Sequence, residues 1–278
     1  MPESPRRSSS LPEYLRPPVV EVAASIQFEN IPRLDAARLG LLWARFRNEF
    51  PDTDQHPPLQ SSSESFDVKR GGRLGFSVET TFPAPRLWFL NTDGTRLIQV
   101  QSNRIVVNWR QLDSGETYVR FSALRELLSD TVKKLVDFLH EEQLGELKPD
   151  QAELTYVNHI PAGNSAALRR PLSDFVTCWN NAPSLSWLGE AEETSFRSQY
   201  VVERAGTPAA RLFVELDSAY TTKGRAPLYV LNLIARGAPI DPTVQSAFDF
   251  FDSAHEWIVN GFTQLTTVAA HKLWERTT

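Results

Sequence analysis

The sequence predicts an α+β fold of two tandem units, each made of a strand, a helix, an antiparallel meander and a closing helix. Short segments alternate apolar and polar residues, as half-buried strands do. Two longer segments carry apolar residues at helical spacing. The order of segments repeats after about residue 146. Because long helices cover one face of such sheets, we expect the other face to be open or to lie over a groove.

The first unit is predicted over residues 17–145. A tail rich in Ser, Pro and Arg, residues 1–16, has no periodicity and is expected to be flexible. Alternation over 18–30 predicts a strand, and apolar residues at helical spacing over 34–50 predict a helix. The Pro- and Ser-rich stretch 51–65 shows no packing pattern and is expected to be a loop.

A meander and a long helix complete this unit. Asp93-Gly94 and Ser102-Asn103 are turn signals between short alternating runs. The predicted strands are 73–80, 85–91, 95–101 and 104–110, and the closing helix is 123–142.

The second unit is predicted over residues 146–278 and packs with the first as one integrated fold. Its expected elements are a strand at 151–161, a short helix at 171–180, strands at 193–203, 209–220 and 226–237, and a helix at 242–274. This order resembles the tandem saddle of the TATA-binding-protein fold. The resemblance concerns the fold and implies no function.

Composition limits the function classes. The chain has 278 residues, a formal net charge of −5 and one cysteine, which excludes an internal disulfide and fits a reducing compartment. The longest apolar run, in 226–235, is too short to span a bilayer, so we expect a cytoplasmic protein without membrane contact. The acidic average disfavours broad nucleic-acid binding, but residues 69–110 hold seven basic and two acidic residues, a local balance of +5.

A His-Glu pair near the C-terminus raises the question of a metal site. The zincin motif needs a second His four residues after the first, and Val259 stands there instead. On a continuous helix His271 would point away from His255, so no shared metal is expected. His255 falls on an apolar stripe, which predicts a buried neutral imidazole or, alternatively, a residue of a pocket wall.

No catalytic residues and no cofactor are predicted. Hydrolase, nucleotide and zinc motifs do not occur in the sequence, so an enzyme is not favoured. Cys178 is interpreted as a packed thiol, and His159 as a structural or edge-exposed residue.

The hairpin around Ser102-Asn103 assigns side chains to faces. A two-residue loop pairs Gln101 with Arg104, which sends Ile98, Val107 and their apolar neighbours to the core. The opposite face then carries the predicted binding residues Arg86, Trp88, Gln99, Gln101, Arg104, Asn108 and Arg110. Arg, amide and Trp side chains suit a polar or anionic partner. A solvated sheet face would carry similar residues, and both interpretations stay open.

Four segments resemble the landmarks of a sporadically distributed family of bacterial proteins of unknown function. They are RPPVVEVAASIQFEN, LIQVQSNRIVVNWR, ELTYVNHI and AHEWIVNGFTQLT…HKLW. The resemblance covers the chain from about residue 16 onward and carries no catalytic residues. It implies an accessory gene of a mobile, toxin-antitoxin-like or defence locus.

Three functions follow as hypotheses. The first is a non-catalytic interaction protein that works through a protein partner. The second is nucleic-acid binding through the basic face between Arg86 and Arg110, which a steep salt dependence would reveal. The third is a small-molecule site or enzyme between the sheet and the C-terminal helix around His255, which requires a closed pocket with polar groups.

Overall fold

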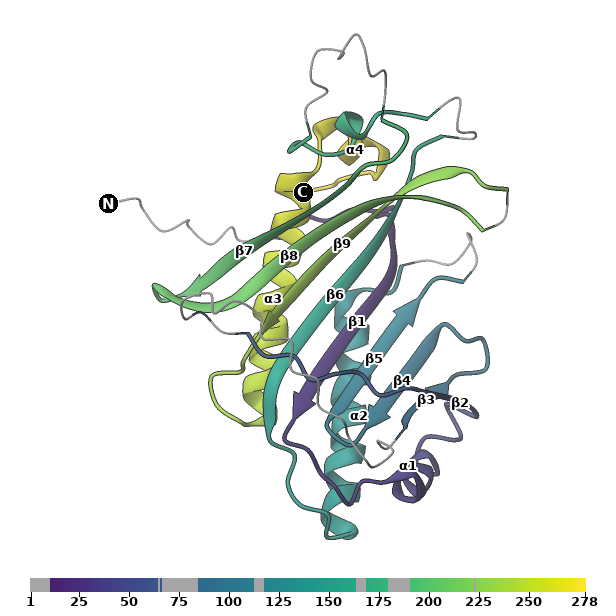
Figure 1. The fold of residues 1–278 in the computed structure, drawn as a ribbon, viewed down its shortest axis with the longest axis vertical. Coiled ribbons are helices and arrows are strands. Elements are labelled where there is room, and N and C mark those ends of the chain that lie inside the picture. Colours follow the sequence, from purple (N-terminus) through teal and green to yellow (C-terminus); the bar gives the residue numbers. More distant parts are fainter. Residues whose placement is uncertain are drawn as a thin grey trace.

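One antiparallel sheet organises the molecule (Figure 1). The computed structural model describes residues 11–64, 66, 85–112, 118–163, 169–179, 191–222 and 224–278. Within these ranges nine strands pair in the order β2-β3-β4-β5-β1-β6-β9-β8-β7. They are β1 Val19–Phe28, β2 Asp52–His56, β3 Arg86–Leu90, β4 Arg96–Gln101, β5 Arg104–Arg110, β6 Pro149–Pro161, β7 Ser195–Arg204, β8 Thr207–Tyr220 and β9 Pro227–Gly237.

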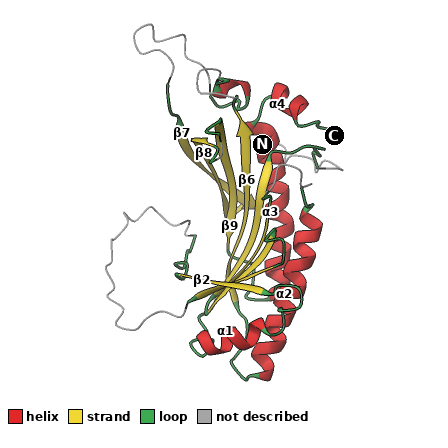
Figure 2. Ribbon diagram, turned by 90° about the vertical axis from the view of Figure 1, so that its right-hand side faces the viewer, coloured by secondary structure: helices red, strands yellow, loops and turns green. Residues whose placement is uncertain are grey.

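Two long helices cover one face of this sheet, and among the described residues no helix covers the other face (Figure 2). They are α2, Phe121–Glu141, and α3, Val244–Leu265; the shorter α1 and α4 span Ala36–Trp43 and Val268–Leu273. The core lies between sheet and helices, where side chains such as Ile98, Leu135 and Phe251 are fully buried. The α+β class is therefore confirmed. None of the helices in the described ranges is long and apolar enough to cross a membrane.

The register of the β4–β5 hairpin is the predicted one. Gln101 pairs with Arg104, and Gln99 pairs with Val106. Ile98 and Val107 consequently face the helices, where both are fully buried. The helix-free side of the sheet, here called the open face, therefore carries the polar side chains of these strands. At the start of β1 an irregularity shifts the register between Val19 and Glu21, and Val19 is buried.

Three predicted elements differ from the structure. The expected loop 51–65 begins with the edge strand β2, whose exposed residues give no apolar alternation. The expected helix 171–180 contains only a 3₁₀ turn at Leu172–Asp174. The expected helix 242–274 breaks at Thr266, where the backbone is extended and Thr267 caps the N-terminus of α4. The strand predicted at 73–80 lies outside the described residues.

The start of the chain packs against its end. Tyr14 is buried, and its hydroxyl bonds Thr263 of α3 at 2.9 Å. The peptide N–H groups of Leu15 and Arg16 donate to the carbonyls of Glu275 and Trp274, each at 3.1 Å. Residues 14–16, which fall within the range 1–16 predicted as a flexible tail, thus pack against the C-terminal segment.

Candidate functional site

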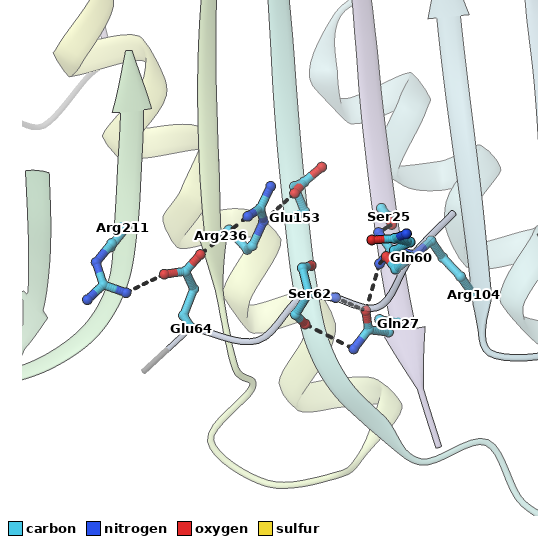
Figure 3. Close-up of polar contacts among 9 residues, drawn as sticks. All are labelled: Ser25, Gln27, Gln60, Ser62, Glu64, Arg104, Glu153, Arg211 and Arg236. Carbon is cyan, nitrogen blue, oxygen red and sulfur yellow. Dashed lines mark hydrogen bonds and ion pairs between the residues drawn. The ribbon is translucent and has the colours of Figure 1, made fainter. Parts of the chain in front are cut away.

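An extended segment crosses the open face of the sheet. Residues 57–64, here called the strap, run from the end of β2 across β1 and β6 toward β9 (Figure 3). Pro57 and Pro58 begin it. Proline restricts its own φ and disfavours the helical region for the residue before it, so the segment starts extended.

Two glutamines hold the strap by its backbone. Gln101 of β4 accepts the N–H of Leu59 on Oε1 at 2.8 Å, and its Nε2 donates to the carbonyl of the same residue at 2.9 Å. Gln27 of β1 repeats this contact with Ser62, at 2.8 Å to its N–H and 3.1 Å to its carbonyl. Each side-chain amide thus satisfies one donor and one acceptor of a peptide strand, as a neighbouring β-strand would.

Arg104 lies beneath the strap. Its Nη2 donates to Gln27 Oε1 at 2.6 Å and to the carbonyl of Gln60 at 3.1 Å, and Nη1 donates to Ser25 Oγ at 3.4 Å. The side chain is only 7% exposed, and burial lowers its pKa from the usual range. Among the described residues no carboxylate bonds this guanidinium, and neutral carbonyl and hydroxyl oxygens accept its hydrogen bonds instead.

An ionic cluster holds the last strap residue. Glu64 pairs with Arg211 of β8, and its other oxygen lies 3.3 Å from Nη1 of Arg236 in β9. Arg236 also pairs with Glu153 of β6. The Glu64 side chain is 9% exposed, so these pairs are shielded from solvent far more than ordinary surface ion pairs.

The seven residues predicted as a binding surface share the open face, but only part of that surface is accessible. Gln99 bonds Asn108 at 2.8 Å and accepts from Arg86 at 2.8 Å, while Arg110 donates to the Gly94 carbonyl at 2.8 Å. The ring of Trp88 stacks on His56. Four of the seven are buried, each at 7% exposure or less: Gln99, Gln101, Arg104 and Asn108.

Four of the seven predicted binding residues are therefore buried on the face that the hairpin register predicted. Lateral bonds between neighbouring strands and the overlying strap remove these groups from solvent. The sequence reasoning missed Gln60, Ser62 and Glu64, because a Pro/Ser-rich loop has no periodicity that would mark it as packed. It also missed Gln27, which lies in β1. The two consecutive prolines ahead of a polar run were the one available signal for an extended segment.

The histidines and the cysteine lie elsewhere. His255 is partly buried and lines a cavity on the helix side of the sheet. His271 is buried in α4, with Nε2 2.8 Å from Thr266 Oγ1. His159 is exposed, and Cys178 is also exposed, so its interpretation as a packed thiol is wrong. No group of three or more His, Cys, Asp or Glu side chains in the described ranges could hold a metal ion.

The chemistry of the strap site is hydrogen bonding to a peptide backbone and charge pairing with a carboxylate. No model of a known protein family matches the chain, and none of the curated proteins matches it. The geometry of the open face is therefore the basis for a functional conclusion.

Proposed function

We propose that the chain is a non-catalytic cytoplasmic interaction protein whose open sheet face binds an extended polypeptide, and that the strap occupies this site in cis. The observation that carries the proposal is the pair of glutamines. Gln101 and Gln27 each bind both peptide groups of one residue, three residues apart along the strap. Bonds to backbone groups do not depend on the side chains of the bound segment, so another extended segment could make them.

A carboxylate adds specificity. Glu64 meets two arginines, and Arg makes charge-assisted bonds to carboxylates that are stronger than bonds between neutral groups. The partner that fits this site is an extended segment with an acidic residue two positions after the residue that Gln27 binds. A buried Arg104 donates to a carbonyl between the two glutamine contacts.

The contacts of the strap allow another extended segment to replace it. Its side chains are mostly exposed, and Leu59, its one large apolar residue, is 37% exposed. Polar contacts hold it. Its neutral hydrogen bonds contribute only about 0.5–1.5 kcal/mol each, and the charged bonds of Glu64 about 1.5–3 kcal/mol, because water replaces them on release. Displacement therefore exposes polar groups that water can solvate and little apolar surface.

The strand order of the sheet supports a site that spans two units. The order β3-β4-β5-β1 of the first half is mirrored by β7-β8-β9-β6 of the second, and each half ends in a long helix. We infer two related units, residues 17–145 and 146–278, arranged as in a saddle. The glutamines belong to the first unit and the arginines that bind Glu64 to the second, so the strap crosses the junction between the two.

The nucleic-acid alternative has less support from this geometry. Arg104 is buried, and Arg211 and Arg236 already pair with carboxylates. The place of the chain in a mobile or defence locus is supported by the family resemblance alone.

The test replaces the strap in the chain, so that the open face is unoccupied, and adds the strap sequence as a separate peptide. In one variant a Gly-Ser segment of equal length replaces residues 57–64, with proline at positions 59 and 62 so that neither glutamine can accept a peptide N–H from it, and a labelled peptide, PPLQSSSE, is titrated with detection by NMR. We expect saturable binding to this variant and much weaker binding to the wild type, whose own strap competes. The matched control adds Gln27→Ala and Gln101→Ala to the Gly-Ser variant and should lose the peptide. A folded Gly-Ser variant that binds no peptide, or one whose binding ignores the two glutamines, would contradict the proposal.

A further inference from the structure

A cavity of about 530 Å³ lies on the helix side of the sheet, away from the strap. The N-terminal segment around Tyr14, the start of α2 at Phe121 and the middle of α3 at His255 line its sides, and β6 and β9 form its floor. Its volume falls within the range of roughly 300–1,000 Å³ that small-molecule sites occupy. Sequence reasoning singled out His255 as a possible pocket residue, and the remaining wall comes from segments far apart in the chain.

A directed chain of hydrogen bonds runs along the wall. The Tyr118 hydroxyl donates to the Tyr156 hydroxyl at 3.4 Å, and Tyr156 lies 3.0 Å from Nδ1 of His255. Because Tyr156 accepts from Tyr118, its own proton is directed to Nδ1, which leaves the ring proton of a neutral His255 on Nε2. The His255 ring also stacks on Phe121, with centroids 4.2 Å apart and planes 9° from parallel.

The interior of the cavity carries no full charge near neutral pH. Burial lowers the pKa of His255 to about 4, so its imidazole is neutral there, and burial raises the pKa of Tyr156 well above its usual value. Among the described lining residues only Glu13 and Arg120 are charged, and both are exposed at the rim. A charged ligand would lose its hydration without gaining a partner inside, so the wall favours a neutral molecule.

Asn158 carries a buried polar atom that lacks a hydrogen-bond partner in the described structure. It lies on β6, lines the cavity and is 1% exposed. Its Nδ2 donates to the Leu231 carbonyl at 3.0 Å, but its Oδ1 has no hydrogen-bond partner within the described structure. A buried acceptor without a partner is costly, and most buried polar groups are satisfied. A ligand that donates an N–H or O–H would satisfy it.

We propose that this cavity binds a neutral, mainly apolar aromatic molecule that donates one hydrogen bond to Asn158 Oδ1. Aromatic side chains supply much of the wall, namely Tyr14, Tyr118, Phe121, Tyr156 and Phe262. Aromatic rings pack well against one another in offset or edge-to-face arrangements, which suits a flat ligand. The site is separate from the strap, so it does not depend on the function proposed above.

The first test compares two probes of nearly identical shape on the wild-type protein by calorimetry. Indole carries a ring N–H, and benzofuran has an oxygen in that place. We expect indole to bind at least tenfold more tightly, because benzofuran leaves Asn158 Oδ1 unsatisfied and places a second acceptor near it. Equal affinity, a preference for benzofuran, or no binding of either probe up to its solubility would overturn the proposal.

Two variants locate the binding. Asn158→Leu should keep benzofuran binding within a few-fold and abolish the preference for indole. Val259→Trp should fill part of the cavity from α3 and weaken both probes at least tenfold. If the preference persists in Asn158→Leu, or if both probes bind Val259→Trp as they bind the wild type, the probes bind elsewhere and the assignment is wrong. Circular dichroism shows whether each variant is folded. If a variant does not fold, the comparison of indole with benzofuran on the wild-type protein decides the proposal.

Discussion

Gln101 binds Leu59 through both peptide groups of that residue, although 42 positions separate the two in the chain. The side-chain amide of Gln101 thus forms the two backbone hydrogen bonds that a neighbouring strand would form. Its amide also donates to Asn103 Oδ1 at 2.6 Å, which fixes its orientation before the strap is bound. This contact ties an exposed segment to a side chain that is 3% exposed.

Gln101→Ala is expected to destabilise the protein by about 1–3 kcal/mol, because the strap and Asn103 lose a buried partner. Denaturant unfolding measures this loss, and hydrogen exchange of the Leu59 amide should accelerate. Gln55→Ala, at an exposed position of the edge strand β2, is the control and should stay within about 0.5 kcal/mol of the wild type. Equal effects of the two substitutions would argue against the glutamine contact.

Arg104→Lys should destabilise the protein although it retains the positive charge. The guanidinium reaches Ser25, Gln27 and Gln60 at once, and a lysine ammonium cannot reproduce this fork. We expect a cost of about 1–3 kcal/mol in thermal or chemical unfolding. A stability equal to that of the wild type would mean that Arg104 contributes charge alone.

Glu64→Gln should loosen the strap at its far end. The substitution keeps the shape of the side chain and removes the charge that faces Arg211 and Arg236, so we expect a loss of roughly 1–3 kcal/mol. Glu49→Gln is the matched control, because Glu49 pairs with Lys134 but its side chain is 62% exposed, where pairs contribute about 0–1 kcal/mol. Raising the salt concentration should affect the Glu64 pair less than the control pair, and the opposite order would contradict a shielded site.

Acidification should destabilise the protein through His255. Its pKa is lowered to about 4 by burial, so the unfolded chain binds a proton near pH 6.5 while the folded protein does not. The contribution of His255 to the free energy of unfolding is fully present above about pH 6.5 and falls as the pH drops toward 4. Because each unit of pKa difference corresponds to about 1.36 kcal/mol, the loss is up to roughly 3 kcal/mol.

The measurement is the stability of the wild type and of His255→Gln as a function of pH. The variant should lose less stability between pH 6.5 and 4. His159 and His271, whose pKa values burial also lowers, contribute in the same direction in both proteins. His140→Gln, at an exposed position on α2, controls for the loss of a histidine elsewhere. Identical pH curves for the wild type and His255→Gln would refute the expectation.

Two glycines should respond to alanine in opposite ways. A Cβ at Gly237 would lie 2.6 Å from the Ala209 carbonyl oxygen and 2.9 Å from Phe250, so Gly237→Ala should cost about 1–3 kcal/mol. A Cβ at Gly40, within α1, meets nothing within 4 Å, and Gly40→Ala should stabilise by up to about 1 kcal/mol through helix propensity. Unfolding midpoints that shift in the same direction would contradict this packing.

Local features of the fold could be predicted from the sequence. The Ser102-Asn103 turn and the alternation on either side fix which face Gln101 and Arg104 share, because a hairpin's register depends on adjacent residues. The periodicity of α2 likewise predicted a helix over 123–142, close to the observed Phe121–Glu141. The break at Thr266 was not predicted, because an apolar pattern continues through it while the extended conformation of one residue ends the helix.

Tertiary structure determined which segment covers the open face. Strand alternation predicts a polar side but cannot say whether solvent or another segment covers it, and the strap bonds its glutamines through backbone groups that every residue has. Glu64 meets Arg211 across 147 positions, and Tyr14 bonds Thr263 of α3 across 249. Pattern rules describe neighbours within a helical turn or a hairpin, whereas these contacts form only when distant segments pack against the same sheet.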